Sequence, residues 1–289
     1  MTAMAAPTRV PVSMPPLYLS RLPLNPRNRA VRADLADCHG LHRTILRAFP
    51  RVPDNGIAGE ATQLPSARDH FDVLYRVEGD RRASDALVLL VQSGVAPDWS
   101  GLLHEYPGYL LASSGAPATF ACKRVDHLYA ALEAGAVLSF RLRANPTRKI
   151  DTYGGPDSGE RRNGRRVELQ GKEKQLEWLR RKGTQGGFEL LTTAVNPDVL
   201  DVRAASTGKV TGTRGTRETS ADADAAAASR SLTFGSVLFE GRLRVVDTDA
   251  LRNALVQGIG SGKAYGFGLL SLAPAGPRDA VATAGTVGR

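Results

Sequence analysis

The chain contains few of the residues that mark several common protein classes. It has only 2 cysteines among 289 residues, Cys38 and Cys122, without CxxC spacing or clustered histidine partners. This pattern does not indicate a disulfide framework or a structural zinc site, so we expect both thiols to be buried as small hydrophobic residues. No apolar run reaches the ~18 residues of a membrane-spanning helix, and residues 1–16 lack the apolar core of a secretory signal. We therefore expect a cytoplasmic protein that spans no membrane.

Aromatic and acidic residues are also scarce. Only 6% of the residues are aromatic, and no K/R-G-F/Y-G/A-F pattern is present, which gives little support to base stacking on an open sheet. The 38 lysines and arginines exceed the 29 acidic residues, for a net charge of +9 and a pI near 9.9. This excess favours an acidic partner such as nucleic acid or a membrane surface, and charge alone does not choose between them.

The order of the expected elements indicates an α+β fold with two domains. The first half predicts strands, helices and a final strand in the order βαββαβ, which is typical of a ferredoxin-like domain. The elements are a strand over 17–24, a helix over 34–49, strands over 71–78 and 86–92, helical segments over 97–107 and 126–133, and a strand over 136–143.

The second half fits the same order with longer interruptions. We expect an exposed loop over 151–166 and a mobile, low-complexity insertion over 202–230. The regular elements are a helix over 172–183, strands over 188–193 and 237–245, a helix over 249–257 and a last strand over 269–274. The expected organisation is a disordered extension over 1–16, tandem ferredoxin-like (RRM-like) domains over 17–146 and 147–275, and a disordered tail over 276–289.

The helix expected over 34–49 carries the first candidate for chemistry. His42 lies at the edge of its apolar face, while His39, Arg43 and Arg47 lie on the polar side. A histidine that is half sheltered by apolar neighbours and flanked by arginines has opposing influences on its pKa, which makes it a candidate acid or base. The alternative is that this histidine is structural.

A glycine-rich segment, GIGSGKAYGFG over 258–268, is the second candidate. It follows a helix rather than a strand and has no GK[ST] ending, so it predicts neither a dinucleotide site nor an NTP site. Backbone amides at Gly260, Gly262, Gly266 and Gly268 could instead approach RNA phosphates beside Lys263. The alternative is that the glycines form tight turns and pack helix against sheet.

Basic residues concentrate between residues 141 and 182. Such a run is often only a solvated face, but its density here favours a phosphate-binding surface. The candidates for RNA contact are Arg143, Arg148, Lys149, Arg161, Arg162, Arg165 and Arg166.

Seven segments in order resemble one known family, the CasE family of CRISPR-associated endoribonucleases from type I-E systems. The resemblance runs from about Leu17 to Pro274. Its segments are YLSRLPLNP, DLADCHGLHRTILRAFP, LVQS, FRLRANP, EWLRRKG, VLFEGRLRVVD and GIGSGKAYGFGLLSLAP.

The resemblance implies two ferredoxin-like domains and cleavage of precursor CRISPR RNA, without metal or cofactor, at the base of each repeat hairpin. It also implies that the protein stays bound to its product as a subunit of the Cascade complex. The catalytic histidine of the family corresponds to His42, and a basic residue of the family corresponds to Arg47. His39 stands where the family often has tyrosine, so the resemblance leaves open whether His39 shares in proton transfer, positions the ribose or is merely tolerated.

The residue inventory agrees with this chemistry. RNA supplies its own nucleophile in the 2′-hydroxyl, so a protein needs only to move protons and to stabilise the phosphorane charge. His42 is the expected acid or base, and Arg43, Arg47 or Lys263 would stabilise the phosphate. The alternatives are a non-catalytic hairpin-binding protein and, less favoured by the order of the motif, a nucleotide-binding enzyme.

Overall fold

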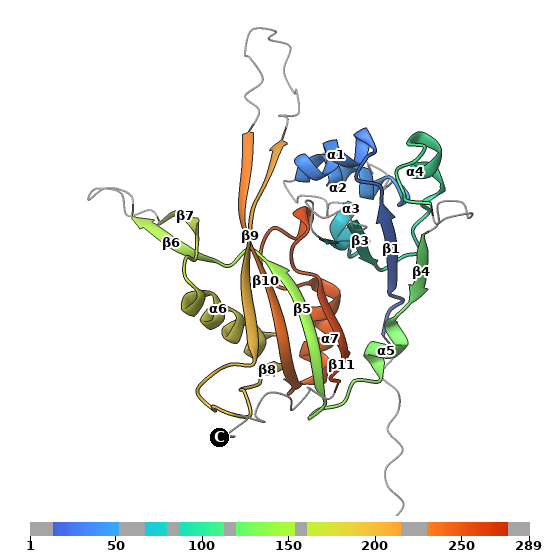
Figure 1. Ribbon diagram of the computed structural model, residues 1–289. Coiled ribbons are helices and arrows are strands. Elements are labelled where there is room, and N and C mark those ends of the chain that lie inside the picture. Colours follow the sequence, from blue (N-terminus) through green and yellow to red (C-terminus); the bar gives the residue numbers. More distant parts are fainter. Residues whose placement is uncertain are drawn as a thin grey trace, which may run out of the picture.

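The computed structural model describes residues 14–51, 67–79, 87–112, 120–153, 161–214 and 230–276 (Figure 1). Two larger antiparallel sheets organise this part of the chain, one from strands that end by residue 124 and one from strands that start at residue 137 or later. No helix among these residues is both long and apolar enough to cross a membrane.

The first sheet has the strand order β2-β3-β1-β4. Because α1 and α2 follow β1 and because α4 lies between β3 and β4, the element order is βαββαβ, as in ferredoxin-like domains. The elements are β1 (Tyr18–Leu24), α1 (Arg29–Ala36), α2 (Cys38–Leu46), β2 (Leu74–Glu78), β3 (Leu87–Ser93), α4 (Ser100–Glu105) and β4 (Ala121–Arg124), with two short helices, α3 (Ala67–His70) and α5 (Asp126–Ala130), outside this pattern.

The second sheet repeats this arrangement. Its order is β11-β5-β10-β8, and the sequence order β5, α6, β8, β10, α7, β11 is again βαββαβ. The predicted fold of tandem ferredoxin-like domains is therefore confirmed. The elements are β5 (Val137–Ala144), α6 (Lys172–Gln185), β8 (Phe188–Leu190), β10 (Arg230–Val245), α7 (Thr248–Gln257) and β11 (Leu270–Pro274).

The strand expected over 136–143 forms as β5, but it pairs with β10 and β11 in the second sheet. It therefore does not complete the N-terminal unit expected over 17–146. The place that it was expected to fill belongs to β4, whose four residues are all exposed at the sheet edge and show no apolar alternation. We propose a domain boundary near α5 instead.

Two segments expected to be irregular contain paired strands. β9 (Val202–Arg214) pairs with β10 up to the Arg214–Arg230 register, so residues 202–214 are not a mobile insertion. The expected loop over 151–166 lies largely in β6 (Thr147–Tyr153) and β7 (Arg161–Glu168), which form a two-stranded sheet. In both cases pairing with a neighbouring strand orders a segment whose own sequence shows no strand pattern. The tips, 154–160 and 215–229, lie outside the described residues, as do most of the extension expected over 1–16 and most of the tail expected over 276–289.

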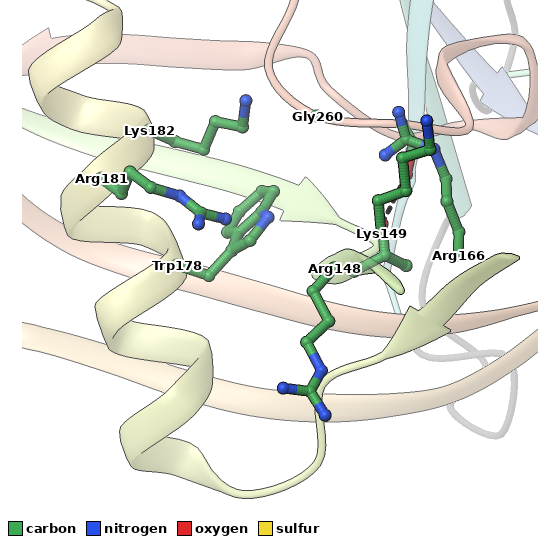
Figure 2. Close-up of a pocket in the computed structure, with 9 residues that line it drawn as sticks. Arg148, Lys149, Arg166, Trp178, Arg181, Lys182 and Gly260 are labelled. Carbon is green, nitrogen blue, oxygen red and sulfur yellow. Dashed lines mark hydrogen bonds between the residues drawn. The ribbon is translucent and has the colours of Figure 1, made fainter. Parts of the chain in front are cut away.

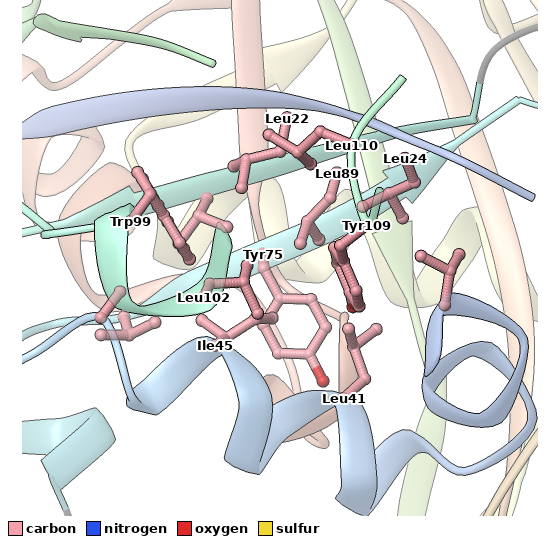
Figure 3. Close-up of a cluster of buried hydrophobic side chains, with 14 of the residues drawn as sticks. Leu22, Leu24, Leu41, Ile45, Tyr75, Leu89, Trp99, Leu102, Tyr109 and Leu110 are labelled. Atoms are coloured by element: carbon pink, nitrogen blue, oxygen red, sulfur yellow. The ribbon is translucent and has the colours of Figure 1, made fainter. Parts of the chain in front are cut away.

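The N-terminal core lies between the first sheet and its helices (Figure 3). Leu41 and Ile45 bring α2 against Leu89 and the buried Trp99, as the apolar face of this helix predicted. Cys38 is buried as expected, whereas Cys122 lies exposed in the edge strand β4, contrary to expectation.

A buried arginine of the first sheet joins the two domains. Arg76 is 2% exposed and donates hydrogen bonds to the backbone carbonyls of Arg141 (3.1 Å) and Leu269 (2.9 Å) in the second domain. Its charge is balanced by Glu78, at 2.6 Å. Since a buried cation needs all these partners, Arg76 holds the domains in one relative placement.

Candidate active site

The histidines stand on α2 because Asp37 interrupts the helix expected over 34–49. Asp37 has extended backbone angles (φ −124°, ψ 103°), and its carboxylate accepts a hydrogen bond from the backbone N–H of His39 at 3.0 Å. This is an ordinary N-cap, which ends α1 and starts a second helix. His39 therefore lies in the first turn of α2, and His42 lies one turn later on the same side.

The two histidines form a cluster with a tyrosine from the second domain. The ring centroids of His39 and His42 are 6.4 Å apart, and Tyr265 lies 6.4 Å from His39 and 6.2 Å from His42. Tyr265 belongs to η1 (Lys263–Tyr265), the short 3-10 helix inside the glycine-rich segment. The site thus lies where the two domains meet.

The glycine-rich segment is held against α2 by a buried tyrosine of the first sheet. The hydroxyl of Tyr75 donates to the carbonyl of Ala264 at 2.9 Å. Gly262 and Gly266, on either side of η1, have φ of 76° and 83°, in the left-handed region. A Cβ on Gly266 would lie 3.1 Å from the Tyr75 ring. These glycines therefore form tight turns, as the structural alternative held, and the turns place Tyr265 beside the histidines.

Two further glycines of the segment have different positions. The backbone N–H of Gly268 donates to the carbonyl of Arg143 at 2.9 Å, so this residue joins the segment to β5. Gly260 lines a pocket on the other side of the segment.

His42 is held as a neutral imidazole. Burial, followed by the influence of His39 and Arg68, lowers its pKa from 6.5 to about 4. Its Nδ1 is buried and has no hydrogen-bond partner among the described residues. At neutral pH this ring is deprotonated, which is the form that a general base requires.

Two cations lie near this cluster. Burial lowers the pKa of Lys263, and the charge of Arg68 lowers it further. Arg68 has a side chain that is 13% exposed, paired with Asp69. Its charge acts on both His42 and Lys263, so positive charge is available beside the imidazole without a direct ion pair to it.

The structure places the two arginines of α2 differently from these cations. Arg43 is exposed. Arg47 donates to Glu105 at 2.5 Å and to the hydroxyl of Tyr106 at 2.8 Å, so its guanidinium is directed to the end of α4. The hydrogen bonds of Arg47 thus tie α2 to its own domain rather than to the histidine cluster.

A basic pocket lies on the other side of the glycine-rich segment (Figure 2). It has a volume of about 440 Å³ and is enclosed by β6, β7, α6 and the segment itself. Within the described part of the chain, five cationic side chains and no carboxylate line it. The lining residues are Thr147, Arg148, Lys149, Arg166, Trp178, Arg181, Lys182, Gly260 and Ser261.

The structure thus brings three of the expected RNA-binding cations, Arg148, Lys149 and Arg166, into one pocket. Arg143 lies elsewhere, with its Nε 2.7 Å from the Ser236 hydroxyl and its guanidinium 5.5 Å from the Phe267 ring centroid. The side chains of three other candidates, Arg161, Arg162 and Arg165, lie outside the described set.

Sequence reasoning missed Tyr265, Arg68 and two pocket cations, Arg181 and Lys182. The only local signal for Tyr265 was an aromatic residue between glycines. Arg181 and Lys182 were visible as charges on the helix over 172–183, but the pocket they face is made by β6 and β7, where a loop was expected. In the described ranges, no group of three or more His, Cys, Asp or Glu side chains is arranged to hold a metal ion.

Comparisons with known proteins agree on one relationship. The model of a family described as CRISPR associated protein matches residues 17–274. The CRISPR-associated endoribonuclease Cse3 of Thermus thermophilus is 34% identical over 265 residues, which cover 89% of this chain and 100% of the relative. The Cascade subunit CasE of Escherichia coli K12 is 30% identical over 259 residues, with 89% and 100% covered.

Solved structures are similar in fold. A structure of the endoribonuclease Cse3 bound to a 19-nucleotide RNA superposes with a TM-score of 0.61 at 31% identity, covering 90% of this chain and 100% of that one. The crystal structure of Cas6e from Escherichia coli K-12 gives a TM-score of 0.54 at 26% identity, covering 89% and 100%.

Proposed function

The chain belongs to the CasE family of CRISPR-associated proteins, and we propose that it is an endoribonuclease that cleaves precursor CRISPR RNA at the base of the repeat hairpin. The similar Cse3 is named an endoribonuclease and has been solved with RNA bound. The observation in this chain that carries the proposal is the neutral His42 beside His39 and Tyr265.

His42 acts as the general base in this proposal. It takes the proton of the ribose 2′-hydroxyl, whose oxygen forms a bond to the adjacent phosphorus while the bond from phosphorus to the 5′-oxygen breaks. The leaving 5′-oxygen takes a proton from a donor in the site, for which His39 and Tyr265 have the rings nearest to His42. The products are a 2′,3′-cyclic phosphate and a 5′-hydroxyl, and no step requires a metal ion.

Lys263 and Arg68 supply positive charge for the phosphorane. The charge of Arg68 acts on both His42 and Lys263, so positive charge lies near the imidazole, as a site for a dianionic transition state requires. For Arg47 to contact the same phosphate, its bonds to Glu105 and Tyr106 would have to break, so we assign Arg47 to holding α2 in place.

The pocket lined by Arg148, Lys149 and Arg166 binds the phosphates of the hairpin in this proposal. Its cations have no carboxylate partner in the lining, which leaves their charge available to a polyanion. Lys182 belongs to the pocket and also influences the pKa of Lys263, so the binding surface runs continuously into the catalytic cluster.

We further propose that the protein remains on its product as a subunit of a Cascade complex in the cytoplasm. The relative from Escherichia coli is named a Cascade subunit. Tight retention of the product needs binding groups that the cleavage chemistry does not use, and the cations of the basic pocket are such groups.

A single-turnover cleavage assay in EDTA with the repeat RNA tests the proposal. General-base assistance contributes ~100- to 10,000-fold, so His42→Ala should lose that factor in rate and keep its affinity for the hairpin. His39→Ala, measured in parallel, reports whether His39 takes part in proton transfer. A substrate with a 2′-deoxy sugar before the scissile phosphate should not be cut.

Three results would contradict the proposal. Cleavage of the 2′-deoxy substrate would exclude attack by the 2′-hydroxyl. Activity that EDTA abolishes and magnesium restores would exclude the metal-independent mechanism. A wild-type protein that binds the hairpin and never cuts it would be a non-catalytic RNA-binding subunit.

A further inference from the structure

The β9–β10 hairpin extends from the second domain to the start of the histidine helix. Figure 1 shows its two long strands rising beside α1 and α2, beyond the rest of their sheet. A ferredoxin-like domain needs neither β9 nor this extension of β10 to complete its sheet. The described part of the hairpin, here called the arm, comprises residues 202–214 and 230–241.

One strand of the arm contacts the N-terminus of α2. The backbone N–H of Thr213 donates to the carboxylate of Asp37 at 3.1 Å, through the same Oδ1 that accepts from the N–H of His39. A single oxygen atom thus joins the arm to the first turn of the catalytic helix. This bond crosses between the domains, and its acceptor Asp37 lies two residues before His39 in the chain.

The contact is too close for any side chain on the arm at this point. A Cβ on Gly212 would lie 2.6 Å from the Sγ of Cys38, 2.7 Å from the Oδ1 of Asp37 and 3.1 Å from the backbone nitrogen of His39. Atoms at such distances have to move apart, so only glycine permits the arm to lie on the helix.

The other strand of the arm contacts the second half of the site. Phe234 stacks on Tyr265, with ring centroids 5.0 Å apart and an interplanar angle of 26°. Phe234 lies two residues from Leu232, which is the partner of Gly212 in the strand register. The arm therefore contacts the helix of His39 and His42 with one strand and the ring of Tyr265 with the other.

We propose that the arm positions the active site, and that Gly212, Asp37 and Phe234 are positioning residues for the cleavage reaction. This inference rests on the proposed function. The histidines come from one domain and Tyr265 from the other, so their relative placement depends on contacts that span the domains. A shift of about 1 Å in a reacting group costs on the order of 100-fold in rate, which is the effect expected when the arm is released.

Two variants release the arm at different points. Gly212→Val places a branched side chain against α2, and Phe234→Ala removes the ring that supports Tyr265. Each should lower the single-turnover cleavage rate at saturating protein by on the order of 100-fold, with hairpin affinity within about threefold of wild type. Phe234→Tyr keeps the stacked ring and should restore the rate. Thr233→Ala changes an exposed neighbour on the same strand and should cleave as wild type does.

The arm is not a positioning device if Gly212→Val and Phe234→Ala cleave at the wild-type rate. It is also not one if rate and affinity fall together, or if Phe234→Tyr is as slow as Phe234→Ala. A measurement without RNA separates this inference from the nuclease assignment. Nuclear Overhauser contacts between the rings of Tyr265 and His42 should be present in wild type and weakened in Phe234→Ala, whether or not the protein cuts RNA. Unchanged contacts in that variant would overturn the inference.

Discussion

The pKa of His42 predicts an unusual pH dependence of cleavage. A histidine with the ordinary pKa of 6.5 is ~9% neutral at pH 5.5, whereas one with a pKa of about 4 is ~97% neutral at that pH. A general base works only when neutral, so kcat/KM should change by less than about 1.5-fold between pH 7.5 and 5.5. With an ordinary pKa, the same range would lower it about tenfold.

The assay is single-turnover cleavage with protein in excess but below saturation, because kcat/KM reports the groups of the free protein. The RNA phosphodiesters keep their charge over this range, so the substrate itself contributes no titration. His42→Ala, measured at each pH, gives the background that is independent of this imidazole. An NMR titration of the RNA-free protein measures the same pKa directly.

A tenfold fall in kcat/KM with a midpoint near pH 6.5 would refute the reasoning. It would mean either that the ring is exposed to water in solution or that another histidine is the base. A rate that rises as the pH falls toward 5.5 would instead make an imidazolium the reacting form, and His42 would then be the proton donor. The NMR value distinguishes a wrong pKa from a wrong role.

Four further outcomes are expected. Because the folded pKa of His42 lies below its unfolded value, its contribution to stability is complete above about pH 6.5 and is lost as the pH falls toward about 4. In urea unfolding, the free energy of unfolding of wild type should therefore fall relative to that of His42→Gln between pH 7.5 and pH 5. Arg76→Met breaks a buried ion pair with Glu78 together with two hydrogen bonds to the second domain, and should lower the free energy of unfolding by about 3 kcal/mol, measured in urea. Arg181→Ala removes a pocket cation and should reduce the salt dependence of hairpin binding by about one phosphate contact, whereas Arg180→Ala, its neighbour outside the pocket, should not. Gly187→Ala places a Cβ 2.2 Å from a backbone carbonyl at a φ of 72° and should destabilise the second domain by more than about 1 kcal/mol in thermal unfolding.

The fold could be predicted where burial leaves a pattern in the sequence. Leu22 and Leu24 alternate with less buried neighbours, and Leu41 and Ile45 recur at helical spacing, so β1 and α2 were recognisable. The edge strand β4 has four exposed residues and leaves no such pattern.

The partner of a strand is a separate question from its existence. β5 was expected as a strand, but its alternation is the same whichever sheet receives it, so the sequence does not reveal that it pairs with β10 and β11. β9 and β7 were missed because their polar, glycine-containing sequences acquire order only through the ladders with β10 and β6.

The candidate site also contains residues that the sequence could identify and residues that it could not. His42 and His39 could be identified because they share a helix face, and a helix has a period that a sequence displays. Tyr265 lies beside them because Tyr75 anchors the glycine-rich segment, and Arg68 belongs to the short helix α3. Tyr265 is more than two hundred residues from His42 in the chain, and no local pattern encodes so distant a neighbour.

The contacts that decide the geometry of the site are therefore those that cross between the domains. Each domain has the complete βαββαβ order and its own core, so the packing inside each domain does not fix how the two are placed. Yet His42, the proposed base, and the ring of Tyr265 come from different domains, and the basic pocket belongs to the second. An RNA hairpin held in that pocket meets His42 only if the domains keep one placement, which Arg76, Tyr75 and Asp37 maintain through hydrogen bonds to backbone atoms of the other domain. Because backbone atoms are the partners, these contacts require no particular side chain at the partner positions, and a sequence pattern cannot reveal them.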